Sequence, residues 1–98
     1  MTERMTPRAA HQAIAASSDG RYGVLLERGT LELGCYAPRG SDPQQPHEQD
    51  EVYVVLSGHG VFELEDTSRP FETGEALFVP AGARHRFVEF SDDFSAWV

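Results

Sequence analysis

From residue 21 onward the chain is a series of short apolar segments, separated by turns rich in glycine, proline, serine and aspartate. Segments of this length between such turns are typical of β-strands, and their close spacing leaves no room for a long helix. Strands are therefore predicted at residues 22–27, 30–37, 52–56, 61–65, 69–72, 76–79, 85–90 and 94–98. Short strands at this spacing predict an all-β sandwich or barrel.

The N-terminal segment has a different pattern. Thr6 and Pro7 are suited to the cap and the first position of a helix, and the alanine-rich residues 7–16 can continue that helix for about three turns. The run from Ser17 to Gly20 should end it. We therefore expect a helical segment within residues 1–20 and a β-barrel domain at residues 21–98.

Composition limits the class of protein. The 98 residues suffice for one small domain, and a net charge of −8 argues against a nucleic-acid partner, which requires a basic surface. No stretch approaches the roughly 18 apolar residues of a membrane span, and the N-terminus lacks the apolar core of a signal peptide. The single cysteine, Cys35, excludes an internal disulfide and a four-cysteine zinc site. We expect a soluble, cytoplasmic protein.

Residues 45–58 place donor atoms directly before a strand. His47 and Glu51 are four residues apart. Alternate side chains of an extended chain share one face, so Gln45, His47, Gln49 and Glu51 are expected to point the same way. Imidazole and carboxylate groups on one face are suitable metal ligands.

The stretch from Gly74 to His85 complements this first one. It reads as a turn, a short strand, a second turn, and a histidine that opens another strand. This stretch resembles the second motif of the cupin superfamily, G-x5-P-x-G-x2-H-x3-N, and matches it at every fixed position as far as His85. The final asparagine falls on Glu89.

The earlier stretch resembles the first cupin motif, in which G-x5-H-x-H is followed after three or four residues by E-x6-G. Glu51 and Gly58 match this motif, and His47 takes the place of the second histidine. The first histidine falls on Gln45, and Gly40 lies one residue closer than the motif asks.

The resemblance implies a cupin-type jelly-roll β-barrel that holds one divalent metal ion. Carried over position by position, its ligands are His47, Glu51 and His85, with Gln45 as a candidate fourth member. Two imidazoles and one carboxylate suit Fe, Mn, Zn or Ni without distinguishing among them. The alternative is an inherited barrel without metal, in which hydrogen bonds satisfy the two histidines.

Two further residues are candidates for contact with a substrate. Tyr53 should face inward with Glu51, and Glu89 has the same strand parity as His85. The alternatives are a core tyrosine and a solvated glutamate. His59, between two glycines, is expected at a hairpin tip without a ligand role.

The resemblance implies a metal-dependent enzyme of dioxygenase or isomerase type acting on a small molecule. A non-catalytic module that binds a small ligand is the alternative, because the fold carries many activities. No phosphate loop, nucleophile elbow or Cys-x-x-Cys pair is present.

Apolar residues on the outer face predict self-association. Val52, Val54 and Leu56 point away from the expected site, and Phe94 to Val98 adds further apolar surface. Such patches favour association, so we predict a two-fold homodimer.

Overall fold

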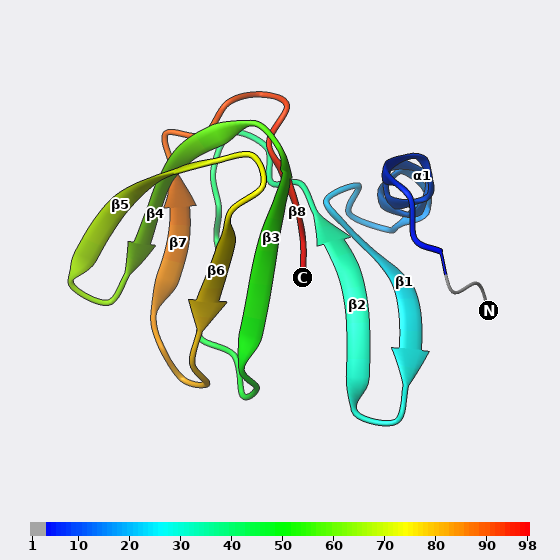
Figure 1. Ribbon diagram of the computed structural model, residues 1–98, viewed down its shortest axis with the longest axis horizontal. Coiled ribbons are helices and arrows are strands. Elements are labelled where there is room, and N and C mark those ends of the chain that lie inside the picture. Colours follow the sequence, from blue (N-terminus) through cyan, green and yellow to red (C-terminus); the bar gives the residue numbers. More distant parts are fainter. Residues whose placement is uncertain (1–3) are drawn as a thin grey trace.

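The computed structural model describes residues 4–98 and consists of short strands with one helix (Figure 1). The elements are α1 (Pro7–Ala16), β1 (Tyr22–Arg28), β2 (Leu31–Tyr36), β3 (Glu51–Ser57), β4 (His59–Leu64), β5 (Thr67–Glu72), β6 (Ala76–Val79), β7 (His85–Val88) and β8 (Ser95–Trp97). Each predicted strand segment therefore forms a strand, and the predicted helix is confirmed.

The strands form two antiparallel sheets. One has the order β1-β2-β8-β3-β6 and the other the order β5-β4-β7. In Figure 1, β4, β5 and β7 lie at one end of the molecule, and α1 lies beside β1 and β2 at the other. The expected all-β class is confirmed, but the two sheets do not join into one closed ring of strands, so the jelly-roll barrel is only partly realised in residues 4–98.

Aromatic side chains fill the main core. Phe87, fully buried on β7, lies 4.9 Å from Phe62 and 4.7 Å from Phe94 between ring centroids. Its ring meets those of Tyr53 and Phe71 edge-on. Because large aromatic side chains dominate the energetics of a small core, this cluster holds β7 in place against β3 and β4.

A smaller cluster joins α1 to the first two strands. Thr6 caps the helix by accepting a hydrogen bond from the amide of Ala9 at 3.1 Å. On the helix face opposite the solvent, Ala10 and Ile14 are buried together with Cys35 of β2. Burial raises the pKa of the Cys35 thiol to about 11, as expected for a packed, neutral cysteine.

The side chains of β3 alternate as the sequence predicts. Tyr53 and Val55 are 1% and 2% exposed, whereas Val52 and Val54 are 53% and 37% exposed on the other face. Phe78 of β6, which pairs with Val52, is also exposed. The outer face of this sheet is therefore apolar at these positions. The expected exposure of Leu56 and Phe94 is wrong, because Leu56 packs against the α1 cluster and Phe94 is buried in the main core. The homodimer stays a prediction.

Two of the strand boundaries that differ from expectation concern candidate site residues. His59 is exposed as expected, but it begins β4 opposite Glu72 rather than forming a hairpin tip. The predicted strand 85–90 is too long, because β7 ends at Val88 and Glu89 has a φ of 51°. Within the described residues, no helix is long and apolar enough to cross a membrane.

Gly23 tests the contact between α1 and β1. A Cβ at this position would lie 2.4 Å from the carbonyl carbon of Ala13, so a methyl group must push the helix away from the strand. We expect Gly23→Ala to lower the free energy of unfolding by about 1–3 kcal/mol. Urea denaturation measures this change. Val24→Ala, at the neighbouring exposed position, is the control. Equal stability of the two variants would contradict the described packing.

Candidate metal centre

Three potential ligands meet at one end of the core. His47 lies in the loop before β3, Glu51 is the first residue of β3, and His85 is the first residue of β7. The Nε2 atoms of His47 and His85 lie 3.6 and 3.5 Å from Oε1 of Glu51. One ligand atom from each residue falls within 4.8 Å of the others, so the group is able to hold a metal ion.

The turn after β6 brings these distant residues together. The amide of Gly82, which has a φ of 80°, donates a 2.7 Å hydrogen bond to the carbonyl of His47. The amide of Ala81 donates to the carboxylate of Asp50 at 2.8 Å. The loop that carries His47 is therefore tied to the turn that precedes His85.

Gln44 also enters the cluster, although the sequence did not single it out. Its Oε1 lies 3.1 Å from Nε2 of both His47 and His85. Its Nε2 donates to Oδ2 of Asp42 at 2.8 Å, which fixes the orientation of the amide. The carbonyl oxygen, not the amino group, therefore faces the two histidines.

Asp42 is the second residue that sequence reasoning missed. Only 3% of it is exposed, and its carboxylate accepts hydrogen bonds from the hydroxyl of Tyr36 and the backbone amide of Phe87 in addition to Gln44. An aspartate between prolines indicates a turn, and no local signal marks it as buried. It connects β2, β7 and the loop in front of the metal centre.

The alternation expected for residues 45–51 is wrong. The segment before Glu51 is not a strand, and bends at residues 48–49 change the direction of the chain. Gln45 is exposed and lines a second surface cavity together with Arg86. The amide beside the histidines belongs to Gln44, and a ligand role for Gln45 stays a prediction.

Tyr53 points inward as expected from its parity. Its hydroxyl lies 2.9 Å from Oε1 of Gln44 and 3.3 Å from both Glu51 and His85. Burial, followed by the negative charge of Glu51, raises the pKa of Tyr53 well above its usual value. The hydroxyl therefore keeps its proton and acts as a donor toward this cluster.

Glu89 lies at the far end of β7 from His85, because Val88 pairs with Val61 while His85 pairs with Leu64. It is exposed, and its left-handed backbone breaks the strand parity on which its expected position depended. A contact with substrate stays a prediction for this residue, but the reasoning from a shared strand face is wrong.

The hydrogen-bond acceptors at this site outnumber the donors, which favours a bound cation. Nδ1 of His85 lies 3.1 Å from the carbonyl of Ala83, which can only accept, so Nδ1 carries a proton and the neutral imidazole presents its lone pair at Nε2. That lone pair faces carbonyl and carboxylate oxygens of Gln44 and Glu51. Tyr53 offers one proton to three acceptors. An excess of acceptors around one point fits a divalent metal ion.

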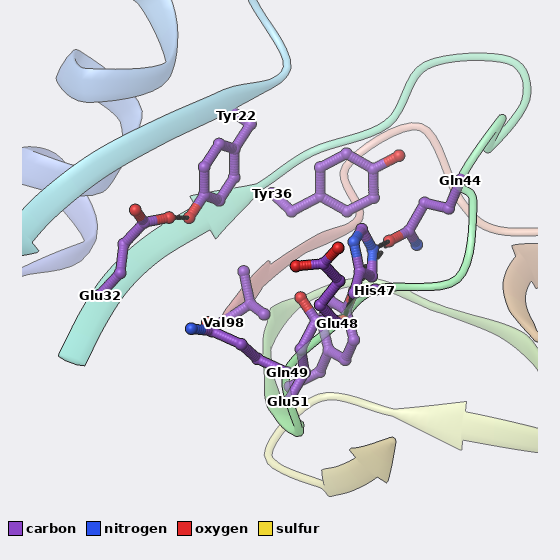
Figure 2. Close-up of a pocket in the computed structure, with 10 residues that line it drawn as sticks. Tyr22, Glu32, Tyr36, Gln44, His47, Glu48, Gln49, Glu51 and Val98 are labelled. Atoms are coloured by element: carbon purple, nitrogen blue, oxygen red, sulfur yellow. Dashed lines mark hydrogen bonds and ion pairs between the residues drawn. The ribbon is translucent and has the colours of Figure 1, made fainter. Parts of the chain in front are cut away.

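A cavity of about 500 Å³ opens beside this centre. The side chains of His47 and Glu51 are 39% and 21% exposed, whereas that of His85 is fully buried. Figure 2 shows Tyr22 and Glu32 on one side of this cavity, with His47 and Glu51 on the other. The open side of the centre therefore faces the cavity through His47 and Glu51.

The comparison with protein families agrees with this arrangement. Residues 32–96 match the family model of the cupin domain. The chain belongs to the cupin family. This cupin is 35% identical over 89 residues to an uncharacterized protein of Streptomyces coelicolor, covering 89% of this chain and 85% of the relative.

Two further similarities extend the comparison. An acireductone dioxygenase of Bacillus thuringiensis is 40% identical over 47 residues, which cover 43% of this cupin and only 28% of the dioxygenase. A cupin 2 conserved barrel domain protein of Salinispora arenicola superimposes with a TM-score of 0.66 at 24% identity, covering 99% of this chain and 85% of that one. This last similarity shows the fold.

Gln44 and Gln45 form a matched pair for a test. We expect Gln44→Ala to weaken the binding of a divalent ion by about tenfold, because it removes an oriented oxygen. We expect Gln45→Ala to change the affinity by less than about twofold. Calorimetry on metal-stripped protein measures both. A larger loss in Gln45→Ala would show that residue 45, as the family motif indicates, supplies the ligand.

Proposed function

We propose that this cupin is a metal-dependent enzyme that acts on a small molecule. The observation that carries the proposal is the convergence of potential ligand atoms from His47, Glu51, His85 and Gln44 beside an open cavity. A resident divalent ion would act as a Lewis acid or redox centre at this place. Fe, Mn, Zn and Ni all suit the donor set.

The candidate ligands of this ion differ in rigidity and in exposure to the cavity. His85 is fixed by the Ala83 carbonyl and the core, so it is the rigid ligand. His47 and Glu51 lie on the cavity side and leave the approach of a substrate open. Tyr53 keeps a proton close to the ligand oxygens, where its hydroxyl can hold an oxygen atom of a substrate in a fixed orientation.

Dioxygenase chemistry is one form of the proposal that the comparisons support. Part of the chain is similar to an acireductone dioxygenase, a protein whose name states a reaction with oxygen. This segment is little more than a quarter of that protein, so the substrate is not carried over with it. An isomerase remains the second form of the proposal, since the same ligands can polarise a carbonyl group.

The lining of the cavity favours an enzyme over a purely binding module. A metal-free ligand pocket in such a fold is expected to be lined by Phe, Leu and Val. Here Val98 is the one aliphatic residue among the lining residues of the described chain, and glutamate, glutamine, tyrosine and histidine supply the rest. Polar groups that converge on one wall of a cavity are typical of a reactive site.

Metal binding should appear as a gain in stability. At a free ion concentration one hundred times Kd, the folded protein gains about 2.7 kcal/mol of unfolding free energy. We expect this gain in the wild type and in the control variant His59→Ala, whose histidine is exposed on β4. We expect Glu51→Gln and His85→Ala to lose most of it.

Thermal unfolding with and without Mn²⁺ or Zn²⁺, together with elemental analysis of the purified proteins, measures this effect. Glu51→Gln preserves the shape of the side chain, so it keeps the test valid even when the buried His85 cannot be replaced without unfolding. Full metal occupancy in Glu51→Gln and His85→Ala, or a wild type that takes up no metal, would overturn the proposed function.

A further inference from the structure

We propose that the cavity beside the metal centre selects uncharged or cationic ligands and discriminates against carboxylates and phosphates. This inference rests on the proposed function, because the ligand is taken to reach a metal ion held by His47, Glu51 and His85. It concerns the wall of the cavity opposite those ligands, which is formed by β1 and β2.

Charge is unevenly distributed around this cavity. Glu32, Glu48 and Glu51 contribute carboxylates to its lining, and no arginine lies among the lining residues of the described chain. The full sequence contains no lysine. A divalent ion brings two positive charges against these three negative ones, so the occupied site keeps a net negative charge unless a ligand supplies the balance.

The hydroxyl groups on this wall are already used. Tyr22 donates a 2.6 Å hydrogen bond to Glu32, and Tyr36 donates to the buried Asp42. Neither hydroxyl proton is left for an anionic ligand, whereas the carboxylate of Glu32 still accepts. The wall therefore offers acceptors and aromatic faces, which suit a ligand with hydrogen-bond donors or a positive charge.

The two sides of the cavity act on each other electrostatically. Burial raises the pKa of Tyr22 first, and the charges of Glu32 on its own wall and of Glu51 on the opposite wall raise it further. Burial and the hydrogen bond to Glu32 are the larger causes, and the smaller, electrostatic part of the rise comes from carboxylates on both walls. An anion placed between the same carboxylates meets the same repulsion.

The arginines near the centre face a different opening. Arg84 and Arg86 line a second cavity of about 340 Å³, together with Glu63 and Glu65. This cavity also reaches Gln44 and His85. Arg84 is already paired with Glu65 at 3.5 Å. The side chain of His85 is fully buried, and His47 and Glu51 do not line this second cavity. An anion held there would therefore face a different side of the site from the exposed ligands.

Three catechols separate charge from metal chelation. Catechol is neutral, dopamine is cationic and protocatechuate is anionic, while all three carry the same pair of chelating hydroxyls. We expect zinc-loaded protein, titrated by calorimetry without oxygen, to bind dopamine at least as tightly as catechol. We expect protocatechuate to bind about tenfold more weakly than dopamine.

Matched variants locate the origin of this preference. Glu32→Gln with Glu48→Gln removes two charges from the cavity and leaves an acceptor for Tyr22 at position 32. We expect this double variant to bind protocatechuate within about threefold of dopamine. The control, Asp66→Asn with Glu72→Gln, removes two exposed charges near β5 and should keep the wild-type preference.

The outcomes separate this inference from the proposed function. A wild type that takes up no zinc overturns the proposed function and this inference with it. Zinc-loaded protein that binds no catechol, binds all three equally, or prefers protocatechuate overturns the inference alone. A preference for protocatechuate that is lost in Arg86→Gln would place the ligand in the second cavity instead.

Discussion

The site depends on the hydrogen bonds that the buried carboxylate of Asp42 accepts. A buried charge is costly unless donors surround it, and here Tyr36, Gln44 and the amide of Phe87 supply them. Through these bonds β2, β7 and the loop before β3 are held in one arrangement. The bond from Gln44 to Asp42 fixes the orientation of the Gln44 amide. It therefore also places the oxygen of Gln44 among the acceptor atoms at the centre.

The aromatic core supplies the other half of the geometry. Phe87 is packed among Phe62, Phe71, Phe94 and Tyr53, and it lies two residues after His85 on the same strand. A ligand that begins such a strand has little freedom to move. The loop that carries His47 has no strand pairing of its own, and its hydrogen bonds to the turn at residues 81–82 compensate for this. Rigid and loop-borne ligands are thus combined in one centre.

Much of this arrangement was predictable from the sequence, for identifiable reasons. Strand parity places Tyr53 inside and Val52 outside, because β3 pairs with β6 without a break from Glu51 to Val54. The motif spacing identifies His47, Glu51 and His85, which the structure brings together.

The rest depends on parts of the chain without periodicity. Residues 43–50 turn irregularly, so the family spacing indicates Gln45 whereas the structure presents Gln44. The one-residue displacement of Gly40 from the motif was a signal that the register of this loop differs. Glu89 does not lie on its expected face, because the strand ends at Val88 and Glu89 itself has a positive φ. The burial of Asp42 is a tertiary property that no short pattern carries.

The most direct test of this account is a crystal structure of the manganese- or zinc-loaded protein, with the ion located by anomalous scattering. The account predicts one strong peak per chain, at about 2.0–2.3 Å from Nε2 of His47, Nε2 of His85 and a carboxylate oxygen of Glu51. It also predicts the oxygen of Gln44, held by Asp42, coordinated to the ion or bonded to a water on it. A peak elsewhere, or one reached by Gln45 with Gln44 turned away, would contradict it.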